Sequence, residues 1–157
     1  MSMNGCLRSV SPTSRLALED PAARAAVLRT LMDADGVELN KLWHAVGFVL
    51  EVAAGENPFD WHGDPLTWTD TGYGPPLLLT PDDVQAIADA LAAVDDEAIT
   101  AAFDADAMRG SDLYCPPPED PAGERAYLDE LRVRIRACRE LFSTAASRGH
   151  GALYYLT

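Results

Sequence analysis

The segment that most constrains the fold of this chain is 39–50, which reads Leu-Asn-Lys-Leu-Trp-His-Ala-Val-Gly-Phe-Val-Leu. Apolar side chains recur here, and just beyond it, at steps of three and four residues: Leu39, Leu42, Trp43, Val46, Leu50 and Ala53. This spacing places them on one face of an α-helix, and that face must pack against the rest of the protein. The sequence therefore predicts a helix over 39–50 in which Trp43 is largely buried.

His44 lies about 100° further round the predicted helix than Trp43, at the rim of its apolar face. Imidazoles exchange protons near neutral pH, so His44 is a candidate acid, base or hydrogen-bond donor. The alternative is a structural histidine that ties the helix to a neighbouring loop. The sequence shows no nucleophile beside His44, and both interpretations stay open.

Apolar periodicity and capping residues predict further helices over 15–18, 20–32, 80–94, 95–103, 104–109 and 119–147. Short apolar runs predict strands over 3–10, 66–69, 77–79 and 153–156, with 77–79 also open to interpretation as the start of a helix. Strands this short cannot stand alone. We therefore expect 3–10 and 153–156 to pair, or to be near neighbours in one sheet.

Residues 54–76 are rich in glycine and proline and also carry the aromatic side chains Phe59, Trp61, Trp68 and Tyr73. Aromatic content argues against disorder, and long loops inside a compact domain are often functional. We interpret the segment as a packed surface loop. Within it, the turn Gly72-Tyr73-Gly74-Pro75 presents Tyr73 to a pocket or packs it on the core.

The charge of the chain limits its partners. It has 25 acidic and 12 basic side chains, giving a formal net charge of -13. Such a surface repels phosphate backbones and anionic lipid, so nucleic acid and membranes are not expected partners. A basic protein partner fits this charge, although acidic surfaces also serve solubility.

The cysteines Cys6, Cys115 and Cys138 are odd in number and far apart, which argues against a disulfide framework and a zinc site. Asp60, His62 and Asp64 could suggest a metal, but solvated polar residues explain them as well. We expect no cofactor. No signal peptide or membrane span is visible, so a cytoplasmic location is predicted.

A candidate pocket emerges from residues that carry chemistry on predicted loops and helix ends: Trp43, His44, Tyr73, Asp112 and Tyr114. A carboxylate such as Asp112 could pair with His44 and orient it. Each residue also has a structural interpretation, because loop aspartates commonly cap turns and tyrosines commonly pack on a core.

Short motifs follow one another along the chain in a set order. They are Met3, Asn4-Gly5 and Val10-Ser11-Pro12, then Leu42-Trp43-His44, Gly72-Tyr73-Gly74-Pro75 with Leu78-Leu79-Thr80-Pro81, Phe103-Asp104 with Met108, Asp112-Leu113-Tyr114, and Ala145-Ala146 through Leu156. This ordered set resembles the YfbM-like family of bacterial proteins, a domain of unknown function. The resemblance covers nearly the whole chain.

The resemblance implies one α+β domain over 1–157, with helices packed on a small mixed or antiparallel sheet and strands from both chain ends. The chain departs from the family at two places. Pro76 stands where the family usually has an arginine, and Cys115 with three prolines stands where it often has another aromatic residue. An anion site that uses that arginine is therefore not carried over to this chain.

No motif for phosphate binding, serine hydrolysis or zinc hydrolysis occurs in the sequence. With the net charge of -13, this favours a protein that acts by binding, for example an immunity-type inhibitor that masks a basic surface of its partner. The alternative is a small-molecule-binding protein or enzyme with its pocket around His44, Tyr73 and Asp112. We expect a monomer or a small homo-oligomer.

Overall fold

The strands of the protein form one sheet. The computed structural model describes residues 2–55, 57 and 63–157. Its strands are β1 (Gly5–Val10), β2 (Val37–Asn40), β3 (Asp64–Pro65), β4 (Leu77–Leu79) and β5 (Gly151–Leu156). Their order is β2-β1-β5-β4-β3, and every neighbouring pair is antiparallel.

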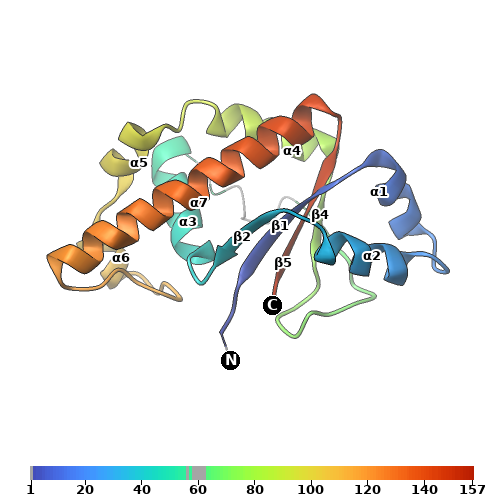
Figure 1. The fold of residues 1–157 in the computed structure, drawn as a ribbon, viewed down its shortest axis with the longest axis horizontal. Helices are drawn as coiled ribbons and strands as arrows, with labels where there is room; N and C mark the ends of the chain where they lie inside the picture. Colours follow the sequence, from blue (N-terminus) through green and yellow to red (C-terminus); the bar gives the residue numbers. More distant parts are fainter. Residues whose placement is uncertain (1, 56, 58–62) are drawn as a thin grey trace.

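The two chain ends meet at the centre of this sheet. β1 pairs with β5 over six positions, from Gly5 opposite Leu156 to Val10 opposite Gly151. β5 also pairs with β4 on its other side, so the last strand of the chain joins the two halves of the sheet (Figure 1). This confirms the predicted pairing of the terminal segments.

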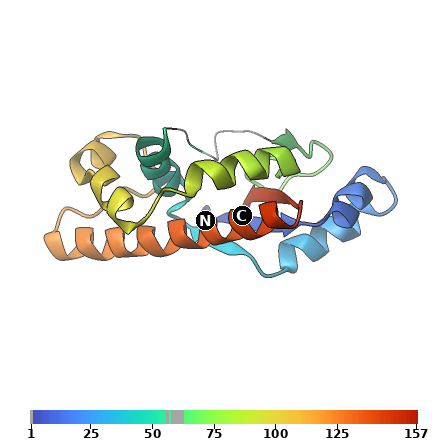
Figure 2. The same ribbon diagram turned by 90° about the horizontal axis from the view of Figure 1, so that it is seen from above.

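Seven helices surround the sheet in the described part of the chain. They are α1 (Pro12–Glu19), α2 (Arg24–Asp33), α3 (Trp43–Ala54), α4 (Pro81–Leu91), α5 (Asp96–Ala102), α6 (Ala105–Gly110) and α7 (Pro121–Ser147). The predicted α+β class is confirmed. Figures 1 and 2 show α1 and α2 at the opposite end of the molecule from α5 and α6.

Helix starts follow the capping residues that the sequence contains. Thr80 accepts from the backbone N–H of Asp83, and the Asp83 carboxylate accepts from the N–H of Thr80, so α4 begins with a complete capping box. Asp95, Asp104 and Asp120 cap α5, α6 and α7 through their side chains. Local sequence therefore sets these helix boundaries.

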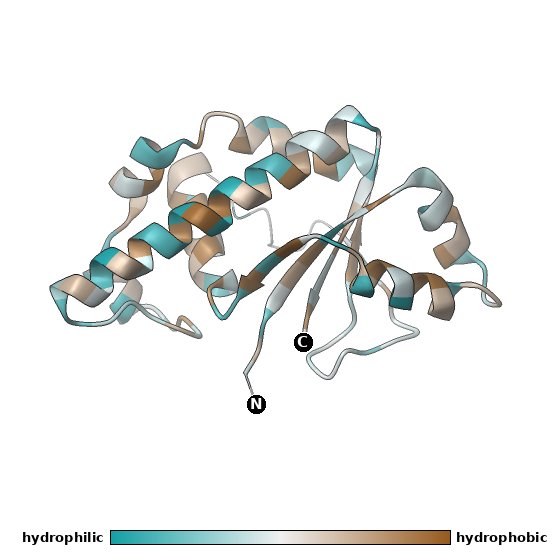
Figure 3. Ribbon diagram, in the orientation of Figure 1, coloured by the Kyte–Doolittle hydropathy of each residue, from teal (hydrophilic) through white to brown (hydrophobic). Residues whose placement is uncertain are grey.

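The sheet separates two apolar cores because successive side chains of a strand point to opposite faces. Leu7 of β1 and Tyr154 of β5 belong to the larger core, which α3, α4, α5 and α7 complete. Cys6 of β1 and Tyr155 of β5 belong to the smaller core under α1 and α2. Figure 3 shows the matching pattern on α7, where apolar and hydrophilic residues alternate along the helix.

The predicted helix over 39–50 is wrong at its start. Residues 37–40 form β2, in which Val37 and Leu39 are buried while Glu38 and Asn40 are exposed. This two-residue alternation belongs to a strand, and pairing with β1 outweighs the helical spacing of Leu39. α3 begins at Trp43.

Three smaller corrections accompany this one. Trp43 is only partly buried, because it is the first residue of α3 rather than a residue of its middle. α2 begins at Arg24, because Asp20 ends α1 and caps a turn through the N–H of Ala22. The short strand of the 54–76 loop is β3 at Asp64–Pro65 instead of 66–69. Phe59, Asp60, Trp61 and His62 lie outside the described residues.

A buried arginine joins β1, β2 and α2 on the smaller core. The Arg8 guanidinium donates to the carbonyl oxygens of Leu7 and Met32, pairs with the Glu38 carboxylate and lies 5.6 Å from the ring centre of Tyr155. Several acceptors thus compensate the loss of water around this charge.

The Cys6 thiol donates to the second Glu38 carboxylate oxygen, with Sγ 3.0 Å from Oε2. Burial, reinforced by this hydrogen bond, raises the pKa of Cys6 to about 11, so the thiol is protonated at neutral pH. Burial alone would raise the pKa of Glu38. The hydrogen bonds from Cys6 and Arg8, together with the Arg8 charge, outweigh it, and this pKa lies below its ordinary value.

Glu38 should therefore make stability depend on acid pH. Because its pKa is lower in the folded state, its contribution is present above the pKa of the unfolded chain and is lost as pH falls through the folded pKa. We expect Glu38→Gln to be less stable than the parent at pH 7, and this difference to shrink below about pH 4. Denaturant unfolding of both proteins at several pH values measures it. A difference that stays constant with pH would contradict this role of Glu38.

Candidate functional site

Three of the predicted site residues lie together at the start of α3. The His44 ring stacks on the Trp43 ring with centroids 4.9 Å apart and an interplanar angle of 9°. The Tyr114 ring lies 6.3 Å from that of Trp43, at 29° to it. We call Trp43, His44 and Tyr114 the aromatic cluster.

The N-terminal segment positions this cluster. A Cβ on Gly5 would lie 2.4 Å from the Cβ of Trp43, so only glycine lets β1 pass this close to α3. The backbone N–H of Met3 donates to the Tyr114 hydroxyl at 2.8 Å. Tyr114 thereby ties the loop between α6 and α7 to the start of the chain.

The hydrogen bond of His44 defines what its ring can do. Its Nδ1 atom accepts from the backbone N–H of Tyr114 at 3.2 Å, which requires an Nδ1 without a proton. The neutral ring then carries its proton on Nε2 and offers that N–H as a donor. In this arrangement His44 holds the 111–118 loop against α3, which agrees with the structural interpretation of this residue.

Asp112 does not join the cluster through a hydrogen bond. Its side chain is exposed, and no hydrogen bond or ion pair links it to His44 among the residues that the structure describes. The His44 Nδ1 that an orienting carboxylate would use is occupied by Tyr114. The structure therefore does not provide the acid–histidine pair that the sequence suggested.

Tyr73 lies beside the start of β4 and the end of β5. Asp70 accepts from the backbone N–H groups of Gly72 and Gly74, and both glycines have positive φ, so the predicted tight turn is formed. Tyr73 lines a cavity of about 70 Å³ with Pro75, Leu77, Tyr154, Tyr155 and Leu156. No ring contact or hydrogen bond joins it to the aromatic cluster within the described ranges.

One buried polar atom of the aromatic cluster lacks a hydrogen-bond partner in the described part of the chain. Trp43 Nε1 is buried and has no hydrogen-bond partner among the described residues. A buried N–H without an acceptor costs about 1–3 kcal/mol, so an acceptor that reached it would bind favourably. The sequence could not predict this, because it follows from how Gly5 and Tyr114 place the indole.

The sequence also did not predict a pair of polar side chains on the sheet. Ser9 of β1 and His150, just before β5, approach to 2.9 Å between Oγ and Nδ1. The two residues are 141 positions apart, and only the β1–β5 register brings them together. Ser9 also lines a hollow of about 430 Å³ beside α7, which contains the exposed Arg148.

Two further observations concern ligands and membranes. Over residues 2–55, 57 and 63–157, no group of three or more His, Cys, Asp or Glu side chains is placed to hold a metal ion. Within the same ranges, no helix combines the length and the apolar character that a membrane span requires.

The protein is a single α+β domain whose terminal strands pair at the centre of an antiparallel sheet, and the aromatic cluster lies at the start of its helix α3. The family model for a domain of unknown function, DUF1877, matches residues 1–155, and the chain belongs to this family. This confirms the family predicted from the ordered motifs.

Among solved structures, the chain is similar to YfbM from Escherichia coli, a protein of unknown function. The TM-score is 0.67 at 16% sequence identity, and the match covers 98% of this chain and 99% of that one. At this identity the likeness shows the fold alone. No curated protein matches the chain.

Proposed function

We propose that this protein acts by binding a basic protein partner on an acidic face built from residues 42–108. This segment holds thirteen of the 25 acidic side chains and none of the 12 lysines and arginines, so it carries the entire net charge of -13. The rest of the chain is electrically balanced. That asymmetry is the observation that supports the proposal.

The described helices of this segment lie on one side of α7. They are α3, α4, α5 and the first four residues of α6, and Figure 2 shows these helices along the same side of the long helix. Among the described residues, arginines pair with two carboxylates of this segment: Arg136 of α7 with Asp96, and Arg109 with Asp106. Arg132 and Arg139 of α7 donate to the Thr100 hydroxyl and the Val94 carbonyl oxygen. The acidic face is therefore only partly neutralised from within.

Three carboxylates of the acidic face are suited to a partner. Glu51 of α3, Asp89 of α4 and Glu97 of α5 are exposed, and no ion pair involves them in the described part of the chain. A field of one sign over several helices speeds the encounter with an oppositely charged protein and fixes its orientation. The finer form of the proposal is an immunity-type inhibitor, which blocks its partner by covering the partner's basic surface.

The test compares two triple variants that change the net charge equally. Glu51→Lys, Asp89→Lys and Glu97→Lys remove the acidic face. In affinity capture from native lysate, the parent should retain a basic protein at low salt and release it at moderate salt, because screening weakens exposed charges. The acidic-face variant should retain it at neither salt concentration.

The matched control carries Glu19→Lys, Asp33→Lys and Glu119→Lys, which are exposed positions outside 42–108 and outside the described ion pairs. It should capture like the parent. If all three proteins capture alike, or if retention ignores salt, the proposal is wrong. Inhibition of the captured partner's activity would distinguish an inhibitor from a simple binding protein.

The second candidate function is binding of a small molecule at the aromatic cluster, and the unpaired Trp43 Nε1 is the observation that favours it. A metabolite with an acceptor for this N–H should raise the melting temperature. Trp43→Phe keeps an aromatic ring but removes the donor, and should abolish the rise. Trp68→Phe serves as control. If no metabolite in a thermal-shift screen separates these variants, the candidate is eliminated.

A further inference from the structure

The acidic face contains a hollow between α3 and α5, and the described side chains that line it are all apolar. Its volume is about 290 Å³, and it is lined by Val52, Ala53, Ala98, Ala101 and Ala102. Four of these five side chains are single methyl groups, which is why the two packed helices leave space between them. Val52, one of the lining residues, is 59% exposed.

Glu97 borders this hollow, and no arginine of α7 is among the described residues that line it. Glu97 lies one helical turn before Ala101, on the same face of α5. Asp96 and Thr100, the α5 residues that α7 arginines contact, are each two positions from a lining alanine. Two positions correspond to about 200° around a helix, so these contacts lie on the far side of α5.

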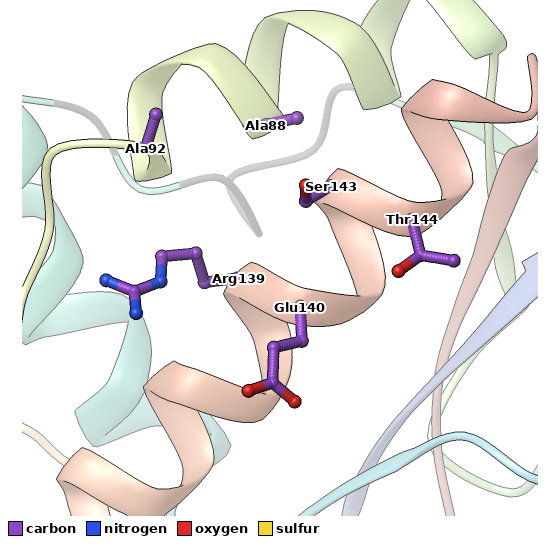
Figure 4. A pocket seen from close by; sticks show the side chains of 6 residues that line it. All are labelled: Ala88, Ala92, Arg139, Glu140, Ser143 and Thr144. Atoms are coloured by element: carbon purple, nitrogen blue, oxygen red, sulfur yellow. The ribbon is translucent and has the colours of Figure 1, made fainter.

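Two larger hollows of the protein differ from the α3–α5 hollow because charged side chains line them. The α4–α7 hollow, of about 380 Å³, is lined by Arg139 and Glu140 together with Ala88, Ala92, Ser143 and Thr144 (Figure 4). The hollow between α7 and the β1–β2 edge contains Arg148 together with Asp35 and Glu140. Each therefore places a cation where a basic partner would have to dock, whereas no charged residue is among the described residues that line the α3–α5 hollow.

We infer that the α3–α5 hollow receives one apolar side chain of the basic partner, next to a lysine or arginine that pairs with Glu97. This inference rests on the proposed function and names its docking point. Charge complementarity selects the occupant: an apolar hollow within a segment free of Lys and Arg favours an amphipathic basic segment. Its volume suits one or two aliphatic side chains, at the lower limit for small-molecule pockets.

The two interactions should have separate kinetic effects. Exposed charges around an interface mainly change the association rate and its dependence on salt. A side chain buried in a hollow mainly changes the dissociation rate. Loss of the apolar anchor should therefore leave the salt dependence of association as it is and shorten the lifetime of the complex.

The probe is a fluorescein-labelled amphipathic peptide of leucine and lysine, about fourteen residues long, so that it can form a helix when bound. Ala101→Trp fills the α3–α5 hollow at an exposed position. The matched control, Ala92→Trp, is also exposed and fills the α4–α7 hollow instead. Melting temperatures establish that both variants fold, and Val52→Ser provides a second test that adds no bulk.

We expect Ala101→Trp to weaken peptide binding about tenfold, chiefly through faster dissociation, as for the loss of an interface anchor. Val52→Ser should weaken it in the same direction, and Ala92→Trp should bind like the parent. Amide shifts on titration should centre on α3 and α5. A peptide with serine in place of leucine should lose most of the affinity.

Equal affinities for Ala101→Trp, Ala92→Trp and the parent would overturn this inference, as would amide shifts centred on α7. The proposed function would survive that result if binding still weakened with salt and in the Glu51, Asp89 and Glu97 variant. Absence of peptide binding at low salt would overturn the docking point and count against the acidic face as well.

Discussion

Removing residues 153–157 is expected to unfold the protein. β5 lies between β1 and β4, so the deletion separates the sheet into two parts and removes the buried side chains Leu153, Tyr154 and Tyr155. Burial of each such side chain contributes about 1.5–3 kcal/mol. Their sum, with the lost ladder hydrogen bonds, is comparable to the whole stability of a domain, about 5–15 kcal/mol.

Far-ultraviolet circular dichroism and amide-proton NMR dispersion measure this outcome. The control lacks only Thr157, whose backbone exchanges two hydrogen bonds with Asn4, the residue just before β1. That protein should fold with a modest decrease in melting temperature. A five-residue deletion that still melts cooperatively, close to the parent, would show that β5 does not hold the sheet together.

Phe142→Ala should produce the second-largest effect, a loss of about 3–5 kcal/mol of unfolding free energy. Phe142 is 0% exposed and is part of the larger core, on the apolar side of α7 with Ile135 and Cys138. Truncation leaves a cavity under the longest helix, and the surrounding sheet and helices can close it only in part.

Val133→Ala is the matched control for Phe142→Ala, since it lies on the same helix and is 51% exposed. It should change the unfolding free energy by about 0.5 kcal/mol or less. Chemical denaturation of the parent and both variants gives the comparison. Equal effects of the two substitutions would contradict the assigned core face of α7.

The elements predicted most accurately from sequence are those defined by neighbouring residues. Thr80, Pro81 and Asp83 together specify the start of α4, because capping is a contact within one turn. α7 likewise begins and ends within two residues of its predicted limits, 119–147. Its ion pairs Asp129–Arg132 and Glu130–Arg134 are local in the same way, since each joins residues three or four positions apart.

The error at 39–50 has a non-local cause. Leu39 fits a helical stripe and a strand equally well, and the choice depends on β1, more than thirty residues earlier in the chain. Because Trp43 then becomes the first residue of α3, it is less buried than predicted. We therefore expect Trp43→Ala to cost less than the 3–5 kcal/mol typical of a buried tryptophan.

The candidate site was predictable in its residue types but not in its geometry. Trp43, His44 and Tyr114 do lie together, whereas Tyr73 packs near β4 and β5. The difference depends on backbone contacts, such as the Tyr114 N–H that occupies His44 Nδ1 and the absence of a Cβ at Gly5. Neither contact has a signature in local sequence.

Binding of a basic partner by the charge concentrated in 42–108 should show itself in the salt dependence of the affinity. The captured partner is purified, and its Kd is measured against the parent and both triple-lysine variants from low to high ionic strength. We expect tight, strongly salt-dependent binding by the parent and by the Glu19, Asp33 and Glu119 variant, and weak, nearly salt-independent binding by the Glu51, Asp89 and Glu97 variant. Equal affinities and equal salt dependence for all three proteins would contradict it.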